Sequence, residues 1–322
     1  MKKWLKYLFE IDKHPHKGLY MVEWAMVVYL VLTLLLMLFM QTKIMSFEPM
    51  LWGRVRILMT TAAMWAVYRM VPCRAMLLVR ISVQMALLSW WYPDTYEFNR
   101  LLPNLDHHFA AFEQSVFGSQ PALWLHERFS SPVVSELLNL GYVSYYPLIL
   151  VVSCYYFLWK FAEFGRSTFI IFASFMVFYC VFIALPVAGP QYYYQAVGLD
   201  EIARGVFPNI GNYFETHQES LPIPGWKDGL FYQMLVDAHN AGERPTAAFP
   251  SSHVGITTVI MFLAWRTGSR RLFWWLMPFF VLMFFATFYI QAHYVIDAIA
   301  GLFAGTVFYF LTGFIYDRLK RP

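Results

Sequence analysis

The chain has 322 residues, of which 59% are hydrophobic and 14% are charged, whereas about 25% of the residues in an average soluble domain are charged. This composition excludes intrinsic disorder and a collagen-like chain, and it argues against a soluble enzyme. The net charge of +4 is small and dispersed, so no nucleic-acid partner is expected. The 3 cysteines show no metal-ligand spacing and do not form a disulfide framework.

Eight apolar segments of roughly bilayer length dominate the chain. They predict an all-α, polytopic integral membrane bundle with about eight spans, interrupted by two long loops at 93–133 and 188–251. Lysine and arginine are roughly twice as frequent on one side of these spans, which predicts cytoplasmic termini and extracytoplasmic (periplasmic or lumenal) long loops. The expected spans are 19–41, 56–71, 75–92, 134–158, 167–187, 252–267, 271–291 and 294–316.

The long loops divide the chain into an N-terminal membrane hairpin region, 1–92, and a working unit, 93–322. Within the expected spans, Glu23 and Arg80 are costly to bury, so they either serve function or form a structural ion pair facing the bundle. In the last span, Gly301 and Gly305 form a small-xxx-small pattern that favours close helix packing.

His293 and Asp297 are four residues apart at the start of the last expected span. On a helix this spacing places both side chains on one face. A carboxylate beside an imidazole selects its tautomer and raises its basicity. Such a histidine can act as a base, a metal ligand or a nucleophile.

A second polar segment, Pro250-Ser251-Ser252-His253, stands at the start of the sixth expected span. Ser251 or Ser252 is a favoured helix N-cap. Free backbone N–H groups and the helix dipole make such a helix start a site for phosphate. Two histidines beside one bound phosphate fit a double displacement, in which one attacks phosphorus and the other transfers protons.

These two segments resemble the type 2 phosphatidic acid phosphatase superfamily. The residues that carry the resemblance are Phe-Pro-Ser-Ser-His at 249–253 and His-Tyr-Val-Ile-Asp-Ala-Ile-Ala-Gly at 293–301. Together with Ala-Gly-Pro-Gln-Tyr-Tyr at 188–193, they are most similar to the branch that contains fungal inositol phosphorylceramide synthase. The resemblance implies a helical, metal-independent phosphotransferase or phosphatase without a cofactor. It also implies a phosphorylated nucleophile at His293, assisted by Asp297, and an acid and base at His253.

The chain departs from the phosphatase motifs at two cationic positions. Arg244 and the following proline match the end of the first motif, but Asp237 stands where the phosphatases have lysine. In the third motif, Ala286 and Thr287 replace a serine and an arginine. Because a phosphodiester carries less negative charge than a monoester, a site with fewer cations favours a diester. We therefore expect transfer of a phosphoryl-linked head group, with Ser251, Ser252 and Arg244 contacting the phosphate.

Several functions remain open at this level. The expected substrates are a phospholipid donor, such as a phosphoinositol lipid, and a lipid acceptor, such as ceramide. A phosphatase acting on phosphatidate, polyprenyl pyrophosphate or lipid A phosphate is the alternative within enzymes, and a transporter is the alternative outside them. Candidate contacts to the head group are side chains of the second long loop, namely Tyr192, Tyr193, Tyr213 and Lys227.

Overall fold

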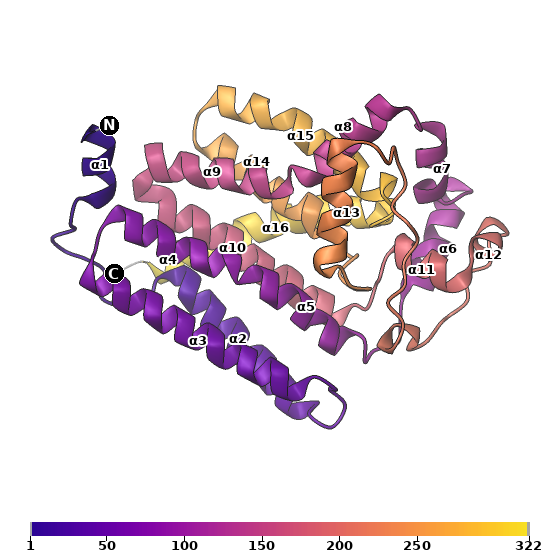
Figure 1. Ribbon diagram of the computed structural model, residues 1–322, viewed down its shortest axis with the longest axis horizontal. Helices are drawn as coiled ribbons and strands as arrows, with labels where there is room; N and C mark the ends of the chain where they lie inside the picture. Colours follow the sequence, from indigo (N-terminus) through magenta and orange to yellow (C-terminus); the bar gives the residue numbers. More distant parts are fainter. Residues whose placement is uncertain (1, 321–322) are drawn as a thin grey trace.

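The computed structural model describes residues 2–320, and these residues form helices and connecting loops. Figure 1 shows long helices lying side by side, with short helices gathered at one end and α1 and the end of α16 at the other. The first part of the chain forms α1 (Lys2–Phe9), α2 (Met21–Phe39), α3 (Phe47–Met70), α4 (Arg74–Ala86) and α5 (Leu88–Asn99).

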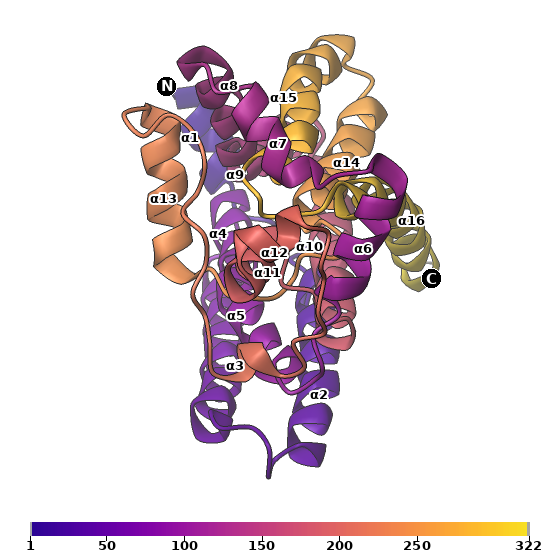
Figure 2. The same ribbon diagram turned by 90° about the vertical axis from the view of Figure 1, so that its right-hand side faces the viewer.

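The remaining helices belong to the expected working unit. The short helices α6, α11 and α12 cover one end of the bundle, which faces the viewer in Figure 2. In chain order the elements are α6 (Asp106–Phe117), α7 (Pro121–Arg128), α8 (Pro132–Val143), α9 (Tyr145–Trp159), α10 (Phe161–Ala184), α11 (Pro190–Val197), α12 (Leu199–Ala203), η1 (Tyr213–Glu215), α13 (Leu230–Gly242), α14 (Ser252–Arg266), α15 (Arg270–Tyr289) and α16 (Val295–Leu319).

Five helical segments are long and apolar enough to cross a membrane, and the count is six if α8 and α9, which are bent by 49°, form one span. The five are α2, the combined α4–α5 segment, α10, α15 and α16. The expectation of eight spans is not confirmed. α3 carries Arg54, Arg56 and Arg69, and α14 has only 15 residues, whereas a span needs about 20 apolar residues.

α14 lies in the core of the bundle, where residues 254–264 are buried except Phe262. Its close neighbour is α16, and three glycines allow the backbones to approach. A Cβ atom on Gly305 would lie 2.2 Å from the carbonyl oxygen of Gly255, and one on Gly301 would lie 2.6 Å from that of Ser251. The predicted small-residue packing is therefore confirmed, and it brings the starts of both helices together.

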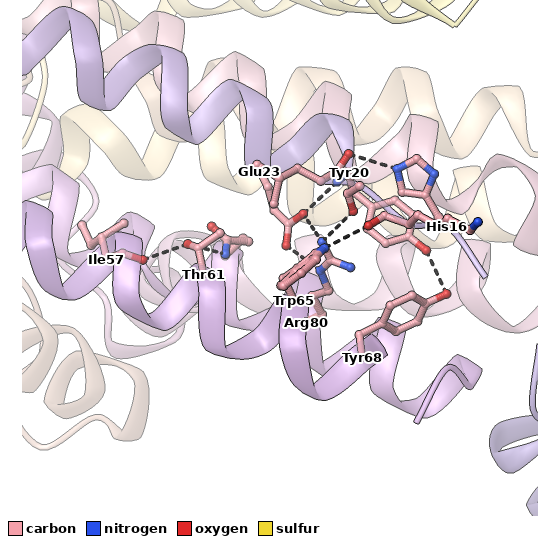
Figure 3. Close-up of polar contacts among 12 residues, drawn as sticks. His16, Tyr20, Glu23, Ile57, Thr61, Trp65, Tyr68 and Arg80 are labelled. Carbon is pink, nitrogen blue, oxygen red and sulfur yellow. Dashed lines mark hydrogen bonds and ion pairs between the residues drawn. The ribbon is translucent and has the colours of Figure 1, made fainter. Parts of the chain in front are cut away.

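Two buried ion pairs join the N-terminal helices. Arg80 on α4 donates to both carboxylate oxygens of Glu23 on α2, at 2.6 and 2.5 Å (Figure 3). The guanidinium of Arg54 on α3 makes a bidentate contact with Asp94 on α5, at 3.0 and 2.8 Å. The structural alternative for Glu23 and Arg80 is thus confirmed as an ion pair inside the bundle.

Candidate active site

The start of α14 offers unpaired backbone donors next to a histidine. Ser251 is the N-cap, and its hydroxyl accepts the N–H group of Val254 at 3.4 Å. Within residues 2–320, no acceptor pairs with the N–H groups of Ser252 and His253. Because these groups stand at the positive end of the helix dipole, the helix start can bind a phosphate.

The ring of His253 is enclosed by two tyrosines from the bend between α8 and α9. The ring centroids of Tyr142 and Tyr145 each lie 4.4 Å from that of His253. Its Nδ1 atom is buried and has no protein partner among the described residues. The imidazole is therefore oriented by aromatic packing, while its ring nitrogens stay available for proton transfer.

His293 lies 5.9 Å from His253, measured between ring centroids. Its Nδ1 atom is 2.7 Å from the carbonyl oxygen of Ala248, a contact that requires the proton on Nδ1 and leaves the lone pair on Nε2. Burial lowers the pKa of His293 to about 4, although the Ala248 carbonyl and the nearby Glu243 carboxylate act in the opposite direction. The ring is therefore neutral near pH 7 and can act as a nucleophile.

Asp297 approaches His293 without hydrogen bonding to it. The expectation of a shared helix face is wrong, because α16 begins at Val295 and His293 lies in the preceding loop. The carboxylate oxygen Oδ2 is 3.7 Å from Nδ1 of His293, and it accepts the N–H group of Tyr294 at 2.8 Å. Asp297 can therefore stabilise a charged His293 electrostatically, while Ala248 selects the tautomer.

Two carboxylates of α6 hold the His293 segment in place, and sequence reasoning did not identify them. Glu113 Oε1 accepts the N–H groups of Val295 and Ile296 at 2.5 and 3.3 Å. Asp106 accepts the hydroxyl of Tyr294 at 3.1 Å. Both carboxylates are fully buried. They therefore support the loop that carries His293 and are not solvated surface groups.

Asp106 also binds the turn before α11. Its two oxygens accept the N–H groups of Ala188 and Gly189, each at 2.7 Å. Gly189 has φ 93°, and a Cβ atom there would lie 2.5 Å from the carbonyl oxygen of Ala292. Glycine is therefore required at this position, where the turn packs against the loop that carries His293.

A further carboxylate that the sequence did not reveal lies beside the histidines. Glu243 interacts electrostatically with His293 and with the neighbouring Arg244, and it accepts the hydroxyl of Tyr92 at 2.6 Å. Burial raises the pKa of Glu243. Tyr192 is within electrostatic reach of both Glu243 and Arg244, so these four residues form one polar group at the site.

Of the other expected head-group residues, Tyr213 packs against the apolar cluster that contains Tyr192. Tyr193 is fully buried and donates to the carbonyl of Pro208 at 2.8 Å, which makes it a packing residue. Tyr213 stacks on His217 with ring centroids 4.1 Å apart. Lys227 is exposed, and among the described residues no hydrogen bond or ion pair joins its ammonium to either catalytic candidate.

Comparison with known proteins gives one match. Neither the curated proteins nor the solved structures match the chain. The family model of the PAP2 superfamily matches residues 107–311, which include His253, His293, Asp297 and Glu113 of α6. Membership of this family supports a lipid phosphatase or phosphotransferase type of function in an integral membrane protein. Since the match covers well over half of the sequence, the chain belongs to the PAP2 superfamily.

Proposed function

We propose that the protein transfers a phosphoryl-linked head group from a phospholipid to a lipid acceptor such as ceramide, through a phosphohistidine at His293. The observation that supports this proposal is the pairing of His253 and His293 beside the free N–H groups of α14. The Nε2 atom of His293 carries a lone pair, because its Nδ1–H donates to Ala248.

In the first step Nε2 of His293 attacks phosphorus, and the bond from phosphorus to the diacylglycerol oxygen breaks. His253, which must enter this step as an imidazolium, gives one proton to that oxygen and becomes neutral. In the second step His253 takes a proton from the acceptor hydroxyl, whose oxygen attacks phosphorus and displaces His293. The proton and both histidines return to their starting states. Asp297, at 3.7 Å, stabilises the positive charge that His293 acquires.

The charge of the site supports a phosphodiester as the donor. Arg244 is a cation of this region, but Glu243 lies beside it and within electrostatic reach of His293. A dianionic monoester would meet little net positive charge, and its desolvation would be poorly offset. The carboxylate of Glu243 with the hydroxyls of Tyr92 and Tyr192 is suited to a head group rich in hydroxyls, for which phosphoinositol is our candidate.

We also propose that the site lies on the extracytoplasmic side and that both termini are cytoplasmic. α16 runs from the site at Val295 to the opposite end of the bundle at Leu319. The excess of lysine and arginine in the loops and tails at that opposite end supports a cytoplasmic location for it.

Purified protein should convert labelled phosphatidylinositol and ceramide into a new inositol-containing sphingolipid, with little free inositol phosphate. Because the proposed chemistry needs no metal, EDTA should leave the rate unchanged. His293→Ala should remove turnover while the melting temperature stays close to that of the unmodified protein. His14→Ala, at an exposed histidine near the N-terminus, is the matched control and should keep full activity.

Two results would contradict this proposal. Faster dephosphorylation of phosphatidate or a polyprenyl phosphate than of any diester would identify a phosphatase. Loss of activity in EDTA with recovery in Mg²⁺ or Zn²⁺ would replace the metal-independent double displacement with a metal-dependent reaction.

A further inference from the structure

A large cavity lies at the end of the bundle opposite the two histidines. It has a volume of about 1010 Å³. Its walls come from the starts of α2, α4 and α10, the ends of α3 and α16, and the segment between α1 and α2. Along α16, Leu319 at the cavity is 22 residues from Asp297, which corresponds to about 33 Å at 1.5 Å per helical residue. The cavity is therefore separate from the candidate active site.

The inner wall of this cavity is apolar. Leu77 and Ile81 of α4 face side chains from two other candidate spans, Val22 of α2 and Phe164 of α10. All of these helices are long and apolar enough to lie in the bilayer. A wall of this kind excludes a small hydrophilic ion as its sole occupant and fits a hydrocarbon chain.

Cations line the rim of the cavity. They are Lys13, Arg74 and Lys320. No carboxylate of the described residues forms an ion pair with any of the three. Arg74 is held in place by the rings of Tyr7 and Phe161, at 4.2 and 4.6 Å from their centroids, so its charge is fixed at the cavity without being neutralised.

The rim also carries carboxylates, but one of them is already engaged. Glu10 and Asp12 line the cavity, and Asp12 accepts the N–H group of His14 at 2.9 Å. The starts of α2, α4 and α10 add partial positive charge, and the ends of α3 and α16 add partial negative charge. The positive charges of Lys13, Arg74 and Lys320 exceed the negative charges of the two carboxylates by one, so the cavity favours an anion.

Two tyrosines of the cavity lie next to a buried cation, Arg80; Figure 3 shows these three side chains together. Tyr20 and Tyr68 line the cavity and are joined by a hydrogen bond of 3.0 Å between their hydroxyls. Arg80 is fully buried against them, with its guanidinium carbon 4.8 Å from the Tyr20 ring centroid and 5.3 Å from that of Tyr68. Its Nη1 atom has no acceptor among the described residues, although Glu23 pairs with the other two nitrogens.

We propose that this cavity binds an anionic phospholipid of the leaflet at the termini, with its phosphate at the rim cations and an acyl chain against the apolar wall. A neutral lipid would leave an excess of positive charge, because only Glu10 and Asp12 stand against Lys13, Arg74 and Lys320 in the cavity. A soluble anion would leave the wall formed by Leu77 and Phe164 in contact with water. An anionic amphiphile places its charge beside the cations and its hydrocarbon chain against the apolar wall.

Native mass spectrometry of the full-length protein, exchanged into nanodiscs containing phosphatidylglycerol and phosphatidylcholine, tests this proposal. We expect a retained phosphatidylglycerol after detergent release. Lys13→Gln with Lys320→Gln should weaken its retention about tenfold, given the attraction of each basic side chain for an anionic lipid. Lys17→Gln with Lys43→Gln removes the same charge from exposed lysines that do not line the cavity and should have no effect.

A second variant tests the apolar wall. Ala162 lines the cavity, so Ala162→Trp should fill it and reduce retention, whereas Val307→Trp, on an exposed part of α16, should not. Equal retention of phosphatidylcholine, or unchanged retention in both cavity variants, would overturn the proposal. Displacement of the lipid by glycerol phosphate as effectively as by phosphatidylglycerol would identify a soluble anion as the occupant instead.

Discussion

The tautomer of His293 has a direct consequence for pH dependence. The proposed mechanism requires a neutral His293 with its lone pair on Nε2, and burial lowers the pKa of His293 to about 4. As the pH falls, activity should therefore be lost around pH 4 rather than near the ordinary histidine value of about 6.5. We expect kcat/KM for a phosphodiester in mixed micelles not to fall between pH 7 and pH 5.5, because His293 stays neutral over this range. A midpoint near 6.5 would mean that water reaches the ring.

Glu113 should make stability depend on pH. Burial raises its pKa to about 7, although the N–H groups of Ile296 and Val295 oppose the shift. A carboxyl whose pKa is raised on folding contributes stability below its unfolded value of 4.5, and this contribution is lost as the pH rises through 7.

Glu113→Gln keeps an acceptor for Val295 but cannot ionise. The melting temperature of this variant, minus that of the unmodified protein, should therefore increase between pH 4.5 and pH 7.5, by an amount equivalent to about 1–3 kcal/mol. Glu127→Gln, in the neighbouring helix α7, serves as the control and should give a difference that is constant with pH. A constant difference for Glu113→Gln would show that its carboxyl is not desolvated.

The sequence was informative about residues whose role depends on short spacing. The sequence predicted Ser251 or Ser252 as the N-cap, and the structure shows that it is Ser251. The expected neighbours His253 and His293 do lie together. Glu113 and Asp106 could not be found in this way, because their partners Val295 and Tyr294 are more than 180 residues away. From the sequence alone, a polar residue in an aromatic loop is expected to be solvated, because the distant segment that buries it is not known.

At the level of elements, the contact between α14 and α16 sets the geometry of the site. Gly305→Ala would place a Cβ atom 2.2 Å from the backbone of Gly255, so the helices must separate. We expect a loss of about 1–3 kcal/mol in stability and a larger fractional loss of turnover, because His253 and His293 belong to the two displaced segments.

The matched control for this substitution is Gly242→Ala, at the end of α13, where a Cβ atom would meet nothing within 4 Å. Thermal melting in detergent and turnover of the same lipid pair measure both effects. If Gly305→Ala kept full turnover, the distance between α14 and α16 would not control the reaction.

The prediction of eight membrane spans is not confirmed where a helix packs against protein instead of lipid. All eight apolar segments are helical, yet α14 is short and surrounded by other helices, so its apolar residues face protein. The hydropathy pattern predicts one span over 134–158, whereas in the structure this segment is bent between α8 and α9. That bend places Tyr142 and Tyr145 against His253, and a hydropathy pattern contains no signal for it.

For the molecule as a whole, the buried pair Arg54–Asp94 ties α3 to the α4–α5 segment, and α5 in turn packs on α10. Asp94→Leu would leave the cation of Arg54 buried without a partner, which typically costs about 3–5 kcal/mol. The double variant Arg54→Met/Asp94→Leu should recover most of this loss. Removing the exposed pair Arg204–Glu201 should change the melting temperature little. A double variant no more stable than Asp94→Leu would show that the pair itself, rather than the unpaired charge, controls stability.

The division at residues 92 and 93 stays a prediction, although the family match begins at residue 107. The ion pair between Arg54 and Asp94 joins the two sides of this division, and α5 (Leu88–Asn99) itself runs across it. Composition separated the long loops from the spans, but it could not show that α5 continues beyond the expected boundary.

The first turns of α14 and α16 differ in whether the protein itself supplies an acceptor for their free backbone N–H groups. The N–H groups of Val295 and Ile296 donate to the carboxylate of Glu113, whereas those of Ser252 and His253 have no protein acceptor within residues 2–320. The described residues therefore offer one such phosphate site between the two histidines, and in the proposed reaction the donor and the acceptor use it in turn. In the proposed double displacement this arrangement predicts ping-pong kinetics, in which the released diacylglycerol departs before ceramide binds. Initial rates measured against phosphatidylinositol at several fixed ceramide concentrations should give parallel double-reciprocal lines, and intersecting lines would require both lipids to be bound at once.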